Sequence, residues 1–207
     1  DGVCNYIDIK NIFVMDGHST DNTRNIAQKK GVNIDLDLKK GKGCGIQIAI
    51  KRIQRDILVL MDSDGSHRPE EFRNFLEVFY RDKEVSMVIG SRIKGGSEEL
   101  HKGFTQIIRL SGNLISAFIV NLVWRSKLTD IQNGFRAVRR TMFQDISLTE
   151  NSFAIEQEMV MKCLKKKIKI VEIPSWELKR KYNSSHITVS KMLPKYIKSF
   201  IKNIFYE

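Results

Sequence analysis

The sequence predicts an α/β fold with a mostly parallel central sheet, and three observations lead to this prediction. Short apolar runs of the kind that form strands buried on both faces recur along the chain. Segments with apolar residues at helical spacing alternate with these runs. Polar clusters follow the ends of several runs. Because ligands bind beyond the carboxyl ends of strands in such sheets, we expect the functional side chains there.

Length and composition indicate one globular domain. The chain has 207 residues, of which 42% are hydrophobic and 9% aromatic, enough for a full core. Its cysteines, Cys4, Cys44 and Cys163, are odd in number and lack the spacing of a zinc site, which favours reduced thiols in the cytosol. The chain begins with Asp1 rather than Met and enters almost at once into a strand, so we expect a fragment or a processed product. No signal peptide is visible.

Positive charge is concentrated at the C-terminal end. The net charge is +11, and residues 162–207 hold twelve Lys or Arg against three acids. Partners suited to this surplus are nucleic acid, an anionic membrane surface or phosphorylated ligands. The longest apolar-rich run, residues 114–124, is interrupted by Ser116 and Asn121 and is too short to span a bilayer. The sequence therefore predicts no membrane crossing.

The first third of the chain contains two βα units. A strand at residues 10–15 leads into a polar loop that begins at Asp16, and the following helix, 24–30, ends at Gly31. A short strand is expected at 32–38. The basic, glycine-rich turn 39–45 then enters a helix at 46–53. Backbone N–H groups and lysines in this turn suit a phosphate, although a merely flexible turn fits the pattern equally well.

The most informative segment is a strand at residues 57–61 that ends in two acids. Asp62 and Asp64 point to the same side of an extended chain, about 7 Å apart by the strand rise. Their oxygens can converge on one divalent ion. Asp, Ser and Gly are also common turn residues, so an ordinary turn is the alternative. A helix with Pro69 near its first turn follows, with acids at its positive end.

The second half continues the alternation and ends in a basic helix. Further strands are expected at 85–90, near 138 and at 168–173, and helices at 104–124 and 153–165. In residues 188–207, Tyr196, Ile197, Phe200 and Ile201 share a face with Ile204 and Phe205 while lysines lie elsewhere. This helix fits two roles, a cap on the core or a helix lying in a membrane interface.

Taken in order, these segments resemble family-2 glycosyltransferases of the GT-A fold, and among them the dolichyl- or polyprenyl-phosphate mannosyl- and glucosyltransferases. Residues 16–23 match the family's Asp-Gly-Ser-Thr-Asp-x-Thr loop with His18 inserted. The later matches are the Asp-x-Asp and Pro-Glu pairs (62–64, 69–70), Gly-Ser-Arg (90–92), Asp-x-x-x-Gly-Phe-Arg (130–136) and Glu-x-Pro (172–174).

Two departures from the family accompany these matches. Residues 180–186 resemble Arg-x-Tyr-Gly-x-Ser-Lys, but Asn183 replaces Gly and His186 replaces Lys, so a permanent charge becomes one that titrates near neutrality. The family's opening Pro-x-x-Asn-Glu strand is absent, so the first strand and helix are expected to be missing. We expect a catalytic domain at 1–187 and the basic amphipathic helix at 188–207.

The resemblance implies a three-layer GT-A sandwich and an inverting hexose transfer from a nucleotide-diphosphate sugar, of the GDP-mannose or UDP-glucose type, to a polyprenyl or dolichyl phosphate. It implies Mg²⁺ or Mn²⁺ bound by Asp62 and Asp64, catalytic roles for Asp64 and Arg136, and a location at the cytoplasmic face of a membrane. The residues expected to bind the nucleotide sugar are Asp16, Gly41, Lys42, Gly43, Asp62 and Ser63. Those expected to bind the acceptor phosphate are Arg92, Arg109, Arg136, Arg180 and Ser185. Asp16 also fits a simple helix-entry residue.

Two other functions fit parts of the sequence. A family-2 transferase with a saccharide acceptor needs a catalytic base, for which Glu158 in the run 156–158 is a candidate. A non-enzymatic basic module for nucleic acid fits the charge, but aromatic residues are not interleaved with the basic ones as stacking platforms. We therefore expect no nucleic-acid partner.

Overall fold

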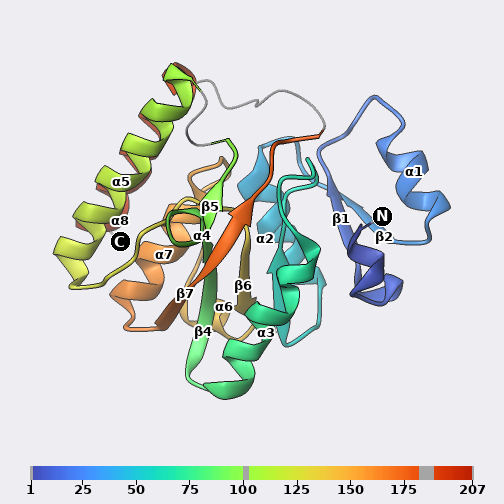
Figure 1. Cartoon of the computed structure of the whole chain (residues 1–207), viewed down its shortest axis with the longest axis horizontal. Coiled ribbons are helices and arrows are strands. Elements are labelled where there is room, and N and C mark those ends of the chain that lie inside the picture. The colour runs from blue at the N-terminus through green and yellow to red at the C-terminus, as the bar shows by residue number, and fades with distance from the viewer. Residues whose placement is uncertain (1, 100–102, 182–188, 207) are drawn as a thin grey trace.

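The computed structural model describes residues 2–99, 103–181 and 189–206. Its main sheet has five strands in the order β3-β6-β4-β7-β5 (Figure 1). Pairing is parallel between β4 and β7 and between β7 and β5, while β6 runs antiparallel to both its neighbours. The prediction of an α/β fold with a mostly parallel sheet is confirmed. The strands are β3 (Ile57–Leu60), β4 (Val85–Ser91), β5 (Gly96–Ser97), β6 (Arg136–Arg139) and β7 (Lys169–Glu177).

Helices cover both faces of this sheet. On one face, residues of α2 (Lys42–Arg52), α5 (Phe104–Trp124) and α7 (Ile155–Lys165) pack with Met87 and Ile89 of β4. On the other, three phenylalanines of α3 (Phe72–Arg81) pack with Val88, whose side chain points the opposite way along the strand. The molecule is thus a three-layer sandwich. The short helices α4 (Arg92–Gly95) and α6 (Met142–Asp145) and a 3-10 turn (Pro69–Glu71) complete it.

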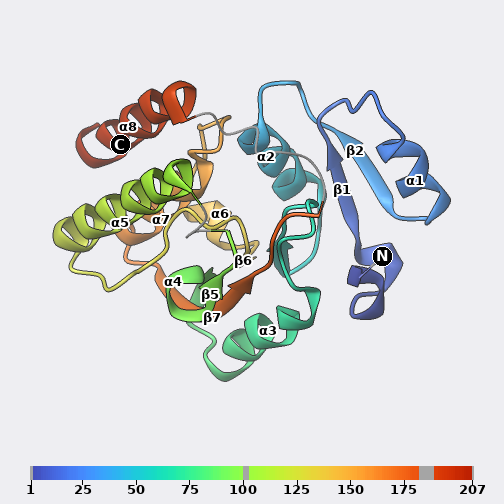
Figure 2. The same cartoon turned by 45° about the horizontal axis from the view of Figure 1, so that its top comes forward.

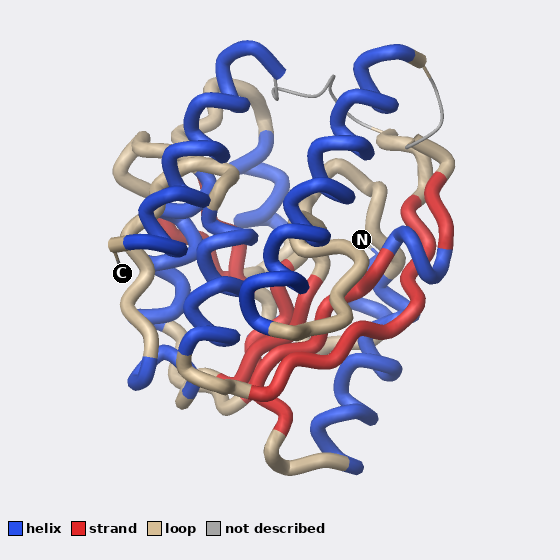
Figure 3. The backbone as a smooth tube through the Cα atoms, turned by 90° about the vertical axis from the view of Figure 1, so that its left-hand side faces the viewer, coloured by secondary structure: helices blue, strands red, loops and turns tan. Residues whose placement is uncertain are grey.

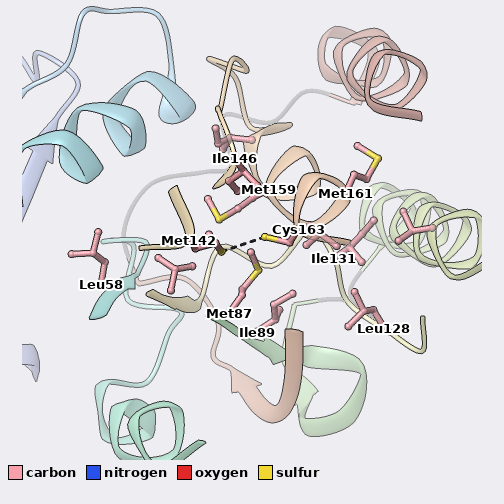
Figure 4. Packing of buried hydrophobic residues seen from close by; sticks show 14 of the residues in the cluster. Leu58, Met87, Ile89, Leu128, Ile131, Met142, Ile146, Met159, Met161 and Cys163 are labelled. Atoms are coloured by element: carbon pink, nitrogen blue, oxygen red, sulfur yellow. Dashed lines mark hydrogen bonds between the residues drawn. The ribbon is translucent and has the colours of Figure 1, made fainter. Parts of the chain in front are cut away.

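The core between the sheet and helices α2, α5 and α7 is rich in sulfur. Figure 4 shows Met87, Met142, Met159 and Met161 around Cys163, whose Sγ lies 3.2 Å from Sδ of Met142. Burial raises the pKa of the Cys163 thiol to about 12, so it stays protonated. All three cysteines are free thiols, as predicted.

The N-terminal segment forms a smaller unit beside the main sheet. Strands β1 (Phe13–Asp16) and β2 (Asn33–Leu36) pair in parallel as a separate two-stranded sheet, and α1 (Thr23–Lys29) connects them (Figure 1). Before β1 the chain forms two 3-10 turns, so the strand begins three residues later than the apolar pattern indicated.

The predicted bounds of the glycine-rich turn are wrong, because α2 begins at Lys42 rather than at residue 46. The first turn of this helix packs against the backbone of the loop before α7, where a Cβ on Gly43 would lie 2.3 Å from the carbonyl oxygen of Glu150. Gly41 precedes the helix with φ of +116°, a conformation that side chains rarely allow. Glycine at both positions therefore permits helix α2 to begin early.

Two helices carry most of the exposed apolar surface. α5 spans the predicted residues, and α8 (Val189–Phe205) lies on the same side of the molecule (Figures 2 and 3). Both pack on α7. The expectation that the apolar run is too short needs correction, since α5 has 21 residues, is long and apolar enough to cross a membrane by length and composition, and only 17% of its most apolar window is buried.

Candidate active site

Strand β3 ends at the acidic turn, which is closed by its own hydrogen bonds. The N–H of Asp62 donates to Nδ1 of His67 at 3.1 Å, and the His67 ring stacks on Phe135 with centroids 4.8 Å apart. Oδ1 of Asp64 accepts from the N–H and the hydroxyl of Ser66, at 3.0 and 2.7 Å. Burial lowers the pKa of His67, which keeps the imidazole neutral and able to accept at Nδ1.

Lys42 joins this turn to two helices. Its Nζ lies 2.6 Å from Oδ1 of Asp62 and 2.8 Å from Oε1 of Glu156, so α2, the end of β3 and α7 meet at one ammonium group. The absence of a side chain at Gly134 makes room, because a Cβ there would lie 2.6 Å from Nζ. Burial alone would raise the pKa of Asp62, but Lys42 outweighs it and the pKa falls to about 2. Asp62 is therefore ionised at any physiological pH.

Asp64 faces a second cation. Nε of Arg180, which follows β7, lies 3.2 Å from Oδ2 of Asp64. Burial lowers the pKa of Arg109 on α5, and the positive charge of Arg180 lowers it further. The two guanidinium groups are thus close enough to repel each other. Glu99 lies near both arginines, since it accepts the backbone N–H of Arg180 at 3.1 Å and acts on the charge of Arg109.

The residues fit a hard divalent cation only together with ligand oxygens. Asp62 and Asp64 offer carboxylate oxygens and Ser66 a hydroxyl, which are donors that Mg²⁺ and Mn²⁺ accept. Among residues 2–99, 103–181 and 189–206 no group of three or more His, Cys, Asp or Glu side chains could hold a metal. Lys42 and Arg180 already neutralise the two carboxylates, so a metal has to displace them or arrive with compensating anions.

The other residues predicted for the nucleotide sugar lie differently. Asp16 is buried at the end of β1, where it accepts the N–H of Ser19 at 2.9 Å, so it also shapes the loop before α1. Ser63 is exposed in the acidic turn. The expected phosphate-binding N–H of Gly43 instead donates to the carbonyl of Asn151 at 2.9 Å. Of the glycine-rich segment, only Lys42 therefore reaches the acidic cluster with its side chain.

Two predicted acceptor-binding arginines are committed to the interior. Arg92 makes a two-pronged ion pair with Asp130, at 2.7 and 2.9 Å, where Asp130 is 0% exposed. Arg136 is also 0% exposed and donates to backbone carbonyls, among them that of Glu156 at 2.9 Å. These contacts leave Arg136 no surface for a phosphate or a reacting atom. Arg109 and Arg180 remain as acceptor candidates, while Ser185 lies outside the described residues.

Sequence reasoning missed the part of the site that α7 and α8 supply. Glu158, the candidate base, is instead structural, since its carboxylate accepts the N–H groups of Thr149 and Glu150 at 3.0 and 2.9 Å. Glu156 two positions earlier reaches the cluster. Tyr196 of α8 lies close by and donates to the carbonyl of Phe153 at 3.3 Å. The run of acids at 156–158 was a signal, but only the orientation of α7 shows which carboxylate faces the site.

Comparison with known sequences finds similar proteins that are glycosyltransferases. Residues 1–147 match the model of glycosyl transferase family 2. The glycosyltransferase AglJ of Haloferax volcanii is 30% identical over 80% of this chain and 53% of its own length. A dolichyl-phosphate hexose transferase of the same organism is 27% identical over 79% of this chain and 68% of its own length. A dolichol-phosphate mannosyltransferase of Pyrococcus furiosus is 28% identical over 79% and 46%. The chain thus spans about half the length of the first of these relatives.

Comparison with solved structures identifies the same architecture. Glucosyl-3-phosphoglycerate synthase from Mycobacterium tuberculosis, in complex with Mn²⁺, UDP and glucosyl-3-phosphoglycerate, superposes with a TM-score of 0.76 at 13% identity, over 99% of this chain and 73% of that one. At this identity the likeness concerns the fold.

Proposed function

This chain belongs to glycosyl transferase family 2 and has the GT-A fold, and from that premise we propose that it transfers a hexose from a nucleotide-diphosphate sugar to a polyprenyl or dolichyl phosphate with inversion. The observation that carries the proposal is the acidic turn at the end of β3, where Asp62 faces Lys42 and Asp64 faces Arg180. Two named relatives are dolichyl-phosphate hexose and dolichol-phosphate mannose transferases, which supports a lipid-phosphate acceptor.

On the donor side, Asp62 and Asp64 would hold Mg²⁺ or Mn²⁺, which supplies positive charge to stabilise the departing nucleoside diphosphate. The structural neighbour holds Mn²⁺ together with UDP, which supports a divalent cation of this kind. When the cation and the diphosphate arrive, Lys42 would exchange Asp62 for a phosphate oxygen while keeping its contact with Glu156, and Arg180 would leave Asp64 for the acceptor phosphate. We propose that Asp16, at the end of β1, contacts the base or ribose, and that the turn at Ser63 borders the nucleotide.

On the acceptor side, Arg109 and Arg180 would bind the lipid phosphate. A phosphate monoester has a second pKa near 6 and is largely dianionic at pH 7, so no general base is required. Its oxygen attacks the anomeric carbon while the bond from that carbon to the diphosphate oxygen breaks, and the electron pair leaves with the nucleoside diphosphate. Attack from the face opposite the leaving group inverts the anomeric centre.

A saccharide acceptor is the second candidate. It needs a base near the acidic turn, and Glu156 rather than Glu158 lies there. The carboxylate of Glu156 is paired with Lys42, which makes it a poorer base. This pairing favours the phosphate acceptor, because a phosphate dianion attacks without giving up a proton.

We further propose that α5 and α8 rest on the cytoplasmic face of an anionic membrane. One stripe of α5, with Asn113, Ala117 and Val120, is buried, while apolar residues such as Phe118 and Leu122 are 67% and 70% exposed. α8 presents Ile197 and Ile201 at 50% and 46% exposure among lysines. Apolar side chains and lysines together suit a helix lying in the headgroup region. A lipid acceptor would then be delivered on the side that carries both helices.

The test is a donor screen of the full-length protein. UDP-glucose and GDP-mannose, radiolabelled in the sugar, are incubated with polyprenyl phosphate and Mn²⁺ or Mg²⁺. Label that moves into the organic phase only when polyprenyl phosphate is present supports the proposal. Label that stays in water on an added oligosaccharide supports the second candidate, and no transfer from either donor contradicts both.

A further inference from the structure

The carboxylate of Glu156 is left half satisfied. Glu156 lies in the first turn of α7 with 4% of its surface exposed, and its Oε1 accepts from Lys42 at 2.8 Å. Its other oxygen, Oε2, is buried and has no hydrogen-bond partner. Within the described residues it is the only carboxylate oxygen in that state. Because buried polar atoms are nearly always paired, an unpaired oxygen beside a candidate site indicates a ligand group that pairs with it.

The surroundings of Glu156 decide what that group is. Arg136 donates to the backbone carbonyl of Glu156, and Lys42 takes only Oε1, so neither cation reaches Oε2 in the structure. A diphosphate has only acceptor oxygens and carries the same charge as the carboxylate, so it cannot pair with Oε2. A hydrogen-bond donor can pair with it, and in a nucleotide sugar the donors are the N–H groups of the base and the hydroxyls of the ribose and of the transferred sugar.

The position of Glu156 favours the sugar. Lys42 bridges Glu156 and Asp62, and Asp62 lies where the proposed function puts the cation and the diphosphate. The sugar is the group bonded to the far end of the diphosphate, whereas the ribose lies toward the base. We propose, on the basis of that proposed function, that Glu156 recognises a hydroxyl group of the transferred sugar through Oε2, while Lys42 orients the carboxylate by holding Oε1.

The experiment compares sugar nucleotides with the same nucleotides lacking the sugar. Calorimetry on the full-length protein with Mn²⁺ measures the affinities of UDP, UDP-glucose, GDP and GDP-mannose for wild type, Glu156→Gln, Glu156→Asp and a control. We expect Glu156→Gln to weaken binding of the preferred sugar nucleotide about ten- to a hundredfold, the range for losing a hydrogen bond to a charged group. The nucleoside diphosphate should bind unchanged or more tightly, because a negative charge near it is removed.

Two variants make the result specific. Glu156→Asp keeps the charge but withdraws the carboxylate, so it should also weaken the sugar nucleotide while leaving the diphosphate unaffected. Glu77→Gln on α3 removes the same charge from an exposed carboxylate paired with Arg81, and should change neither affinity. A deoxy-sugar donor that lacks the recognised hydroxyl should bind wild type and Glu156→Gln equally.

Three outcomes would overturn the inference. If the Glu156 variants weaken diphosphate and sugar nucleotide equally, the contact is to the ribose or is merely structural. If both variants bind the sugar nucleotide as wild type does, Oε2 has no role. If wild type binds none of the four nucleotides, the proposed function fails, and this inference with it.

Discussion

At the scale of single residues, the two acids at the end of β3 are not equivalent. Asp62 is fixed by Lys42, whose own charge is shared with Glu156, whereas Asp64 is held by Ser66 and by Arg180. Each carboxylate thus has a cationic partner on a different element. This pairing keeps two negative charges close together without a metal, and it supplies two cations that can turn to a phosphate.

Replacing Asp64 by Asn tests the role of the acidic turn. The variant keeps the shape and the Ser66 contact but loses the charge, so we expect turnover to fall about a hundredfold or more, corresponding to about 2.7 kcal/mol of barrier. Radiolabel transfer measures it, and the melting temperature shows whether folding is intact. Asp82→Asn, in an exposed turn paired with Lys169, is the control with equal charge change. Full activity in a folded Asp64→Asn protein would remove the turn from the mechanism.

Replacing Arg180 by Gln tests the acceptor site. If Arg180 binds the lipid phosphate, the KM for polyprenyl phosphate should rise about tenfold, which corresponds to a loss of about 1.4 kcal/mol of binding free energy. The affinity for nucleoside diphosphate should change less. Lys179→Gln, an exposed neighbour with the same loss of charge, should leave both unchanged. Equal effects of the two variants on the acceptor KM would mean that only the general positive field matters.

The residue pattern predicted part of this site, for a physical reason. An apolar strand followed by two acids fixes where Asp62 and Asp64 lie, because strand alternation and the sheet edge are local properties. The role of Arg136 is only partly local: its guanidinium donates to the carbonyls of Ile131 and Asn133, within five residues in sequence, but also to that of Glu156 on α7. The same holds for Gly43, whose N–H is taken by a loop more than a hundred residues away.

At the scale of elements, a buried ionic network connects strands β4 and β7. Arg92 binds Asp130 and also Glu177 at 3.4 Å, and Glu172 accepts the N–H groups of Thr129 and Asp130, each at 2.8 Å. Asn113 of α5 donates to Asp130 at 3.0 Å, so the helix is joined to the same group. The family motifs at 90–92, 130–136 and 172–174 therefore support the scaffold beneath the site.

The network predicts a pH dependence of stability. Burial alone would raise the pKa of Asp130, but Arg92 and its hydrogen bonds lower it below the unfolded value of about 3.9. The unfolded state then binds the proton more readily, so the stabilisation is complete above about pH 4 and is lost as the pH falls through the lower folded value. Asp130→Asn should cost about 3–5 kcal/mol at pH 7, because it leaves Arg92 buried without its charge partner.

Urea unfolding between neutral and acid pH measures this dependence. The free energy of unfolding of wild type should decline below about pH 4, and the curve of Asp130→Asn should be flatter there. Asp8→Asn, an exposed carboxylate paired with Lys10, is the control and should leave the unfolding free energy at pH 7 nearly unchanged. Parallel curves for wild type and Asp130→Asn would show that Asp130 does not titrate with unfolding.

The exposed faces of α5 and α8 lead to a second prediction at this scale. Phe118→Ser with Leu122→Ser should lower binding to phosphatidylglycerol-containing vesicles about tenfold or more, since each side chain contributes about 1.5–3 kcal/mol when buried. The matched control is Leu76→Ser with Tyr80→Ser on α3, where the same kinds of side chain are 39% and 79% exposed on the other side of the sheet. Cosedimentation measures both. Equal losses from the two pairs would contradict a membrane surface at α5.

The sequence located α5 to the residue, because its apolar positions recur at helical spacing over 21 residues. It could not show how the apolar face of α8 divides. Phe200 and Ile204 pack toward the core, while Ile197 and Phe205 remain outside. The residues on this face are one broad apolar stripe in sequence, and the placement of α7 decides which half of it is covered.

At the scale of the whole molecule, the charge distribution, the topology and the exposed apolar surface are all consistent with the proposed membrane surface beside the acidic turn. The basic excess lies in the last quarter of the chain, which includes Arg180 and α8. Helix α8 is joined to the site, since Gln157 beside Glu156 donates to the carbonyl of Tyr196 at 2.8 Å. The surface proposed to meet the membrane and the acidic turn are therefore connected through α7.

The last prediction concerns the stability of the whole chain with its ligands. Because Lys42 and Arg180 neutralise the two acids, Mn²⁺ alone should bind weakly, whereas Mn²⁺ with the correct nucleoside diphosphate should bind well. At about a hundred times the dissociation constant the pair should stabilise the fold by about 2.7 kcal/mol, which for this size raises Tm by about 5–10 °C. Differential scanning calorimetry measures the shift, with AMP as the control nucleotide. Adding EDTA should abolish most of it, and an equal shift in EDTA would show that the side-chain cations hold the diphosphate without a metal.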